Sequence, residues 1–441
     1  MLQSFKEHID KKFPFLKESS ILTTISGGLD SVVLTHFCHK MGLKISLAHC
    51  NFNLRGVESD EDESFITKLA DDLDLKVFIE HFETEDFAKE HQMSIQMAAR
   101  ELRYEWFYNL AETLSFDYIL TAHHADDNLE TVLINLTRGT GISGLTGIPE
   151  IHDKIIRPLL PFSRQELEKY ALQNQIKWRE DSSNASEKYL RNKIRHQVIP
   201  ILKEINPYLL DSFKNTVDNL NDTVDIVDES LNAVAKRAIV ELDAQHIKFK
   251  ISEFKKVNNP KAYLYEMFKE YGFTQWSDIV NLLDAQSGKQ AFSETHRLIK
   301  DRSHLILSEI KSQVQNEIVL DKEEALNNKI VFPNGILEVT QVNEAGESDK
   351  STIYIDKEKL SFPFTIRKWE DGDFFYPLGM KGKKKLGKYF KDEKLNLLEK
   401  ENVWLLCSQE NIVWVLGMRA DERFKVSENT QRILKIDLNS N

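Results

Sequence analysis

Several groups of polar residues near the start of the chain have the types and spacing to handle a phosphorylated ligand. The run Ser26-Gly27-Gly28-Leu29-Asp30-Ser31 follows an apolar, β-branched stretch at 21–25. That stretch predicts a buried parallel strand, and the apolar positions from Val32 to Cys38 predict a helix that ends near Gly42. A strand, a glycine turn and a helix N-terminus form an anion site, because exposed N–H groups and the helix dipole both point at the ligand. We therefore expect a di- or triphosphate at this loop.

Two common nucleotide-binding patterns are excluded at this loop. No lysine follows the glycines, so the Walker pattern is absent, and Gly-x-Gly-x-x-Gly does not occur there. The loop at 26–31 must therefore belong to another class of phosphate-binding loop.

A second group of polar residues follows a predicted strand at 118–122. It holds the pair His123-His124 together with Asp126, Asp127 and Glu130. One of the two aspartates is expected to cap the next helix, and Asp127 and Glu130, three positions apart, share one helix face. Two carboxylates there could hold Mg²⁺ for a nucleotide or bind an incoming ammonium group, and the spacing does not separate these roles.

Two pairs of arginines have helical spacing. Arg100 and Arg103 lie three apart, and Arg191 and Arg195 lie four apart on a predicted helix that also carries Lys188. Pairs of arginines can clamp phosphate oxygens, and surface ion pairing is the alternative for the first pair.

The elements that position these groups alternate between strands and helices. Strands predicted at 21–25, 45–49, 76–79 and 118–122, with helices between them, indicate an α/β fold, a parallel sheet with helices on both faces. Ligands of such sheets bind beyond the carboxyl ends of the strands, where the polar groups fall.

Other segments carry weaker predictions. The acidic run at 58–63 is expected to be a solvated helix start, because negative charge suits a helix N-terminus. The four-glycine stretch at 138–148 is expected to be an irregular loop and 157–161 an extended segment, with a helix beginning at Ser163.

Three domains are predicted. Pro200 and Pro207 are expected to close a catalytic domain at 1–207. A mainly helical domain follows at 208–311, with an amphipathic helix from Leu220 and a hairpin at 297–307. The alternating pattern of strands then predicts a mainly β domain at 312–441.

Composition narrows the class of protein. No apolar run approaches a membrane span, and the cysteines Cys38, Cys50 and Cys407 form no C-x-x-C pair. These features indicate a cytoplasmic protein without disulfides, zinc or a membrane partner.

A local basic segment opposes the net charge of −12. Residues 380–394 hold seven lysines against two acids, including Lys383, Lys384, Lys385 and Lys388. Lysines interleaved with the aromatic pair Tyr389-Phe390 suit contact with a phosphate backbone and some stacking, so a nucleic-acid partner is expected.

The motifs resemble a known family. The loop at 26–31 resembles the pyrophosphate loop of the ATP-pyrophosphatase (N-type) superfamily, whose fold is adenine nucleotide alpha-hydrolase-like. Within that superfamily, the ordered motifs resemble bacterial tRNA(Ile)-lysidine synthetase across nearly the whole chain. The other matching motifs are His49-x-Asn51-Phe52-x-Leu54-Arg55, Ala98-Ala99-Arg100-x-x-Arg103-Tyr104, Thr121-Ala122-His123-His124-x-x-Asp127-x-x-Glu130-Thr131, Arg138-Gly139-Thr140-Gly141, Arg157-Pro158-Leu159-Leu160, Asp181-x-Ser183-Asn184, Arg191-Asn192-x-Ile194-Arg195, Gly372-Asp373 and Pro377-Leu378-Gly379-Met380.

The resemblance implies a two-step ligation that uses ATP and Mg²⁺. The C2 oxygen of the wobble cytidine in an isoleucine tRNA with a CAU anticodon would be adenylated. The ε-amine of free L-lysine would then displace AMP, and pyrophosphate is the other product. The resemblance also allows a homodimer.

The resemblance further implies roles for the polar groups. The loop residues Ser26, Gly27, Gly28, Leu29, Asp30 and Ser31 would bind the β- and γ-phosphates, with Asp30 helping to hold Mg²⁺. The backbone near Ala48 and His49 would meet the adenine and ribose.

The remaining implied roles concern the reacting groups. Arg103 and Arg195 would stabilise charge on the α-phosphate and the intermediate. Asp127 and Glu130 would bind Mg²⁺ or orient the lysine, with His124 assisting. The lysine-rich segment would hold the tRNA.

Three competing functions share part of this pattern. A base-thiolating tRNA enzyme would need a catalytic cysteine or a C-x-x-C, which the chain lacks. An amide-forming synthetase would not need the lysine-rich segment. An RNA-binding protein with a vestigial ATP site would not need the intact loop together with Asp127 and Glu130.

Overall fold

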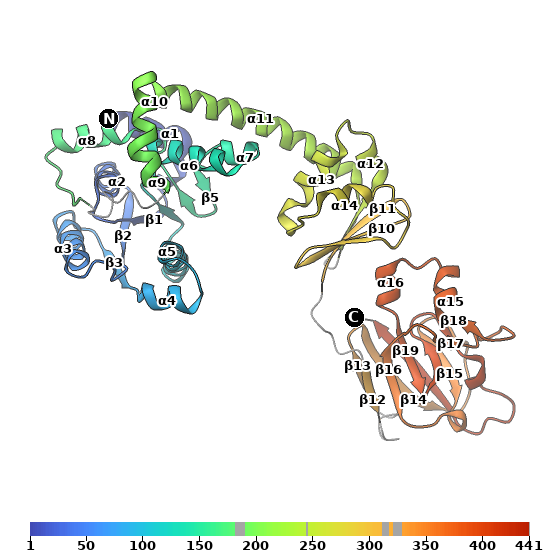
Figure 1. The fold of residues 1–441 in the computed structure, drawn as a ribbon. Helices are drawn as coiled ribbons and strands as arrows, with labels where there is room; N and C mark the ends of the chain where they lie inside the picture. Colours follow the sequence, from blue (N-terminus) through green and yellow to red (C-terminus); the bar gives the residue numbers. More distant parts are fainter. Residues whose placement is uncertain (181–189, 244–245, 311–316, 321–328, 441) are drawn as a thin grey trace. The chain divides into compact units, whose positions relative to one another are not determined.

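The computed structural model describes residues 1–180, 190–243, 246–310, 317–320 and 329–440. Its chain divides into two compact units, 1–228 and 229–441 (Figure 1). The motif at 181–184 and Lys188 lie outside the described residues. No helix among the described residues is long and apolar enough to cross a membrane.

A six-stranded sheet in the order β3-β2-β1-β4-β6-β5 forms the centre of the first unit (Figure 1). Thr23 in β1 lies opposite Leu47 in β2 and Leu120 in β4, and both pairings are parallel. The chain leaves β1 toward β2 and β3 and then returns to β4 on the other side, so the sheet has a switch point between β1 and β4, where ligands bind in such folds. The strands are β1 (Ser20–Thr24), β2 (Lys44–Asn51), β3 (Val77–His81), β4 (Tyr118–Leu120), β5 (Ile151–His152) and β6 (Ile155–Ile156).

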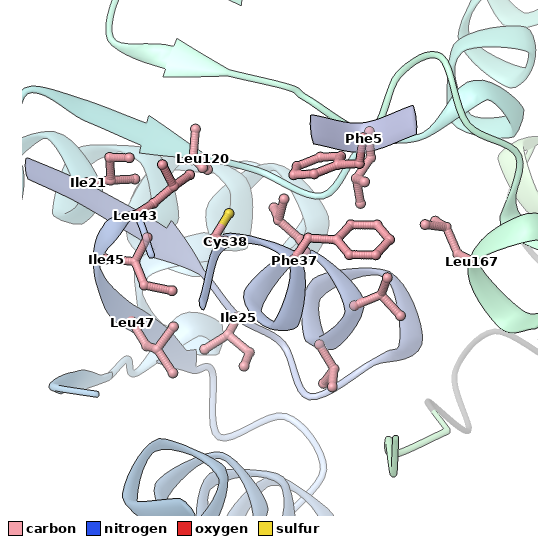
Figure 2. Packing of buried hydrophobic residues seen from close by; sticks show 14 of the residues in the cluster. Phe5, Ile21, Ile25, Phe37, Cys38, Leu43, Ile45, Leu47, Leu120 and Leu167 are labelled. Carbon is pink, nitrogen blue, oxygen red and sulfur yellow. The ribbon is translucent and has the colours of Figure 1, made fainter. Parts of the chain in front are cut away.

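Neighbouring residues of β1 pack into different clusters because side chains alternate along a strand. Ile21 belongs to the same cluster of buried residues as Phe5 of α1 and Phe37 of α2, and Figure 2 shows members of that cluster, whereas Leu22 belongs to a second cluster with Phe107 of α5. The predicted layers, helices on both faces of a parallel sheet, are confirmed. The helices are α1 (Leu2–Lys12), α2 (Leu29–Lys40), α3 (Val57–Asp72), α4 (Thr84–Glu90), α5 (Ile95–Thr113), α6 (Ala125–Arg138), α7 (Ile142–Leu145), α8 (Arg164–Gln173), α9 (Leu190–Lys193), α10 (Ile199–Ile205) and α11 (Leu209–Ala238).

Some local predictions for the first unit were wrong. Residues 157–161 form turns after β6, and the glycine-rich loop contains the short helix α7. Pro200 does not break the helical pattern: it lies in the first turn of α10, where proline is tolerated because an N–H at that position would have no partner within the helix. The domain boundary expected at Pro200 and Pro207 stays a prediction. The helix predicted from Leu220 begins earlier, at Leu209.

The second unit begins within α11, at residue 229, and continues with a five-stranded antiparallel sheet in the order β7-β8-β11-β10-β9. The predicted hairpin is confirmed, with Leu298 opposite Leu307. The predicted helices are present, and the sheet is an addition that the mainly helical prediction did not contain. These elements are β7 (Ile239–Leu242), β8 (His246–Lys250), α12 (Ile251–Lys255), α13 (Pro260–Phe268), α14 (Trp276–Asn281), β9 (Gln290–Phe292), β10 (His296–Asp301) and β11 (His304–Glu309).

The C-terminal part of the second unit is mainly β, as predicted. Its sheets β12-β16-β19-β20-β21 and β13-β14-β22-β15 share one core, in which Trp404 and Trp414 pack with Leu337 and Ile436. The elements are β12 (Glu317–Leu320), β13 (Lys329–Phe332), β14 (Gly335–Val342), β15 (Thr352–Asp356), β16 (Phe364–Lys368), β17 (Phe374–Phe375), β18 (Lys384–Lys385), α15 (Leu386–Asp392), α16 (Leu397–Glu401), β19 (Trp404–Ser408), β20 (Asn411–Val415), β21 (Arg419–Ala420) and β22 (Ile433–Ser440).

Candidate active site

The glycine loop between β1 and α2 is closed by its two serines. The Ser31 hydroxyl accepts a hydrogen bond from the Ser26 N–H at 3.2 Å and donates to the Gly28 carbonyl at 3.0 Å. Gly27 has φ of +84°, a left-handed conformation that glycine adopts without cost. Gly28 caps α2, so the loop ends at a helix N-terminus, where an anion is stabilised.

His49 and Ala48 lie directly under this loop. The His49 Nδ1 is 3.0 Å from the Ile25 carbonyl, and the Ile25 N–H donates to the Ala48 carbonyl at 2.9 Å. Burial lowers the pKa of His49, which favours its neutral ring, and the contact with Ile25 joins β2 to the end of β1.

The acidic helix α6 begins with His124, and the prediction that Asp126 or Asp127 caps it was wrong. The His124 Nδ1 accepts from the Asp127 N–H at 3.4 Å, and the Asp127 carboxylate accepts from the His124 N–H at 3.2 Å. Asp126 instead accepts from the Arg164 N–H at 2.9 Å and from Lys203 at 2.7 Å. Asp126 therefore connects α6 to α8 and α10. The Asp127 carboxylate stays beside His124.

His124 also connects the glycine loop to α6. Its Nε2 lies 3.6 Å from Asp30 Oδ2 and 3.4 Å from Asp127 Oδ2. Burial lowers the pKa of His124, but the nearby carboxylates, Asp127 first, outweigh it and raise that pKa above its ordinary value. The switch point of the sheet therefore gathers Asp30 and Asp127 around Nε2 of one imidazole, and Asp126 Oδ2 lies 3.8 Å from its Nδ1.

Glu130 lies on the next turn of α6, with its side chain only 1% exposed. Arg195 donates to it from Nε at 2.6 Å and from Nη2 at 3.0 Å, and Nη2 also donates to Asp127 at 3.1 Å. Burial raises the pKa of Glu130 despite this pairing. Arg191 donates to Thr131, the next residue of α6, at 3.1 Å.

The other predicted arginines lie near aromatic rings. The Arg103 guanidinium is 5.2 Å from the centre of the Phe52 ring, just beyond β2, and that of Arg100 is 4.9 Å from the Tyr104 ring. The structure thus joins Arg195 directly to the acidic pair and places Arg103 beside the segment that follows β2.

One buried aspartate was missed by the sequence analysis. Asp62, in the run predicted to be solvated, is buried and accepts from Arg55 at 2.9 Å and from Arg179 at 2.8 Å. An acidic run at a helix start gives no signal that one member turns inward to meet distant arginines.

The predicted basic segment lies in the C-terminal part of the second unit. Lys383, Lys385 and Lys388 are exposed, but Lys384 is bonded to Asp392 at 2.8 Å. The expectation of stacking by Tyr389 and Phe390 was wrong, because both rings are buried in the cluster under α15. The exposed ring is that of Phe374, and Lys383 Nζ lies 4.9 Å from its centre.

The cysteines show no sign of a catalytic thiol. Cys38, Cys50 and Cys407 are all free. Burial raises the pKa of Cys38 and of Cys50 to about 12, so neither thiol ionises readily.

The site combines the glycine loop after β1 with the acidic start of α6 at the switch point of the sheet. This combination is typical of ATP-using enzymes of the PP-loop class. Residues 1–202 match the model described as PP-loop domain. Residues 242–310 match the TilS substrate binding domain, and residues 364–438 match the TilS substrate C-terminal domain.

Curated relatives are similar over nearly the whole length. The tRNA(Ile)-lysidine synthase of Parabacteroides distasonis is 39% identical over 99% of this chain and 99% of its own. That of Bacteroides thetaiotaomicron is 38% identical over 97% of each chain, and that of Porphyromonas gingivalis W83 is 36% identical over 92% of this chain and 91% of its own. The chain belongs to the tRNA(Ile)-lysidine synthase family, whose members are PP-loop ligases.

Proposed function

We propose that this chain joins lysine to C2 of the wobble cytidine in the isoleucine tRNA with a CAU anticodon, using ATP. The relatives are named tRNA(Ile)-lysidine synthase, which supports lysidine in an isoleucine tRNA as the product. The observation that carries the proposal is the contact of His124 with both Asp30 and Asp127, since it brings the phosphate loop and the acidic helix to one place.

In the first step the C2 oxygen of the cytidine attacks the α-phosphorus of ATP, and the bond to pyrophosphate breaks. The loop at 26–31 binds the departing phosphates through its N–H groups and the N-terminus of α2. Arg103 and Arg195 offset the negative charge that develops at the α-phosphate. Ala48 and His49 border the nucleoside.

The residues present fit a bound Mg²⁺. Among the described residues, Asp30 Oδ1 is buried without a hydrogen-bond partner, and carboxylate oxygens are the ligands that Mg²⁺ prefers. Asp30 and Asp127 would hold the ion. When bound, it supplies positive charge that stabilises the phosphates.

In the second step the neutral ε-amine of lysine attacks C2, the C2–O bond breaks, and AMP leaves. The amine must lose a proton as the new C–N bond forms. Glu130 is the proposed acceptor: it shares the Nη2 group of Arg195 with Asp127, so it lies beside that carboxylate, and burial raises its pKa, which favours proton acceptance. Asp127 orients the incoming amine beside it.

The exposed lysines Lys383, Lys385 and Lys388 are proposed to contact the tRNA backbone, with Lys384 contributing less. A homodimer and a cytoplasmic location complete the proposal, both by analogy with the family. Thiolation is less well supported, because burial raises the pKa values of Cys38 and Cys50.

The test is incorporation of radiolabelled lysine into an unmodified transcript of the CAU isoleucine tRNA, with ATP and Mg²⁺ present. We expect acid-stable label with the wild type, none with Asp127→Asn, and undiminished label with Asp86→Asn, a control at an exposed aspartate of α4. A methionine tRNA with the same anticodon should stay unlabelled. Release of AMP and pyrophosphate without labelled tRNA would contradict lysine as the nucleophile.

A further inference from the structure

A buried carboxylate joins three segments that border the phosphate loop. Asp62, on α3, has a side chain that is 9% exposed. Its Oδ2 accepts from Arg55, in the segment after β2, at 2.9 Å. Its Oδ1 accepts from Arg179 Nε, in the segment after α8, at 2.8 Å, and Arg179 Nη2 also reaches Glu61 at 2.8 Å. The position of Arg179 is therefore fixed by two carboxylates of one helix.

The main chain of Arg179 contacts the loop itself. Its N–H donates to the Gly27 carbonyl at 2.9 Å. A side chain added at Gly27 would meet Ile66 and Phe65 of α3 at 3.6 and 3.7 Å, so α3 also borders the loop. The loop is thus bordered by α3 and by the backbone of Arg179, and the ion pair of Arg179 with Asp62 joins these two segments.

The orientation of the Gly27–Gly28 peptide decides where the loop's donor points. A trans peptide is planar, with its C=O and N–H on opposite sides, so fixing the Gly27 carbonyl toward Arg179 turns the Gly28 N–H the other way. That N–H makes only a long bond of 3.4 Å to Ser26 Oγ, which leaves it able to donate to a stronger acceptor such as phosphate. Two successive glycines place little restraint on this peptide, since neither has a Cβ. An external anchor is needed to hold it.

We infer that Arg179 is a positioning residue for nucleotide binding: anchored on Asp62 and Glu61, it orients the Gly27–Gly28 peptide so that the Gly28 N–H faces the phosphates. This inference rests on the proposed placement of ATP at the loop. It assigns a role to Arg179 and Asp62 that involves no contact with substrate by either side chain.

Binding of α,β-methylene-ATP with Mg²⁺, measured by titration calorimetry on the full chain without tRNA, tests the inference. We expect Arg179→Ala to weaken binding about tenfold. Asp62 keeps Arg55 as a partner in this variant, so its carboxylate is not left unpaired. Arg179→Lys, which retains one charged donor, should recover part of the affinity, and it serves as the second variant if Arg179→Ala does not fold.

The matched control is Arg423→Ala. Arg423 binds the buried Asp421 of the second unit at 2.9 and 2.8 Å, so its loss imitates the general cost of removing such a pair. Both variants should lower the melting temperature, but only Arg179→Ala should weaken nucleotide binding. Equal nucleotide affinity in the two variants would overturn the inference.

Gly27→Ala separates the inference from the proposed site. If the wild type binds the nucleotide and Gly27→Ala does not weaken it, the loop is not the phosphate site, and both proposals fail. If Gly27→Ala weakens binding and Arg179→Ala does not, the phosphate site stands and only the role of Arg179 is wrong.

Discussion

Arg195 and Glu130 form a two-point ion pair in which Nε and Nη2 of the arginine lie 2.6 and 3.0 Å from the two oxygens of a carboxylate that is almost wholly buried. The same guanidinium reaches Asp127 at 3.1 Å. One cation therefore compensates two acids at the site where chemistry is proposed, and it favours the charged form of Glu130 in a place where burial favours the neutral form.

Removal of Arg195 should cost both stability and activity. Arg195→Ala leaves a buried carboxylate without its main partner, and we expect a loss of about 3 kcal/mol in the free energy of unfolding, measured in urea. The initial rate of lysine incorporation should fall at least ~100-fold, because a charged group facing the transition state is lost. Arg191→Ala is the control for stability: its Nε lies 3.7 Å from Glu130 and its side chain is 47% exposed. Its cost should stay below about 1 kcal/mol, and equal losses would contradict the special place given to Arg195.

An alanine at Gly27 should separate backbone strain from phosphate binding. Gly27 and Gly42 have φ of +84° and +70°, so alanine at either position meets the same backbone penalty of about 1–2 kcal/mol. The added methyl group has room at both sites. We expect similar losses in thermal stability, with weaker binding of ATP analogues in Gly27→Ala alone. Unchanged binding in Gly27→Ala would argue against the loop as the phosphate site.

The ion pair of Asp373 with Arg367 should make the free energy of unfolding depend on pH in the acidic range. Arg367 donates to both Asp373 oxygens at 2.8 Å. Burial raises the pKa of Asp373, but the hydrogen bonds from Arg367 outweigh it and hold that pKa below its usual range. A lowered pKa in the folded state means that the stabilisation is complete above the unfolded pKa of about 3.9 and is lost as the pH falls through the folded value.

The substitution Asp373→Asn tests this dependence. At pH 7 it should lower the free energy of unfolding by about 2 kcal/mol. The difference from the wild type should shrink as the pH falls below about 4. Asp371→Asn, at an exposed neighbouring position, should change stability little at any pH. A difference for Asp373→Asn that does not change with pH would show that the charge is not its cause.

The sequence predicted what depends on local spacing. The strand, glycine loop and helix at 21–42 and the acid pair on α6 follow from short-range patterns, and the structure confirms these elements. The sequence did not predict that Arg195 would pair with Glu130, 65 positions away, or that Asp62 would meet Arg179, 117 positions away. Such pairs depend on how the strands are ordered in the sheet, which periodicity does not specify.

The basic segment shows a second limit of sequence analysis. Lysines beside Tyr389 and Phe390 look like a stacking surface, but the same pattern is produced by a helix with one apolar face. Leu386, Tyr389 and Phe390 have the spacing of such a face, and all three are buried. The ring available to a ligand, Phe374, lies on β17 and has no lysine next to it in the sequence.

The exposed lysines should contribute more to tRNA binding than Lys384, which is already paired with Asp392. Each phosphate contact releases counterions, so Lys385→Ala and Lys388→Ala should each reduce the slope of log affinity against log salt by about 1, in filter-binding assays with the CAU isoleucine tRNA. Lys384→Ala should change the slope less, because Asp392 already neutralises that ammonium. Lys329→Ala, at a β13 lysine 3.5 Å from Glu338, is the control and should leave the slope unchanged. If Lys384→Ala has the largest effect instead, its ion pair must open on binding, and the tRNA surface would then include the face of α15 that Asp392 occupies.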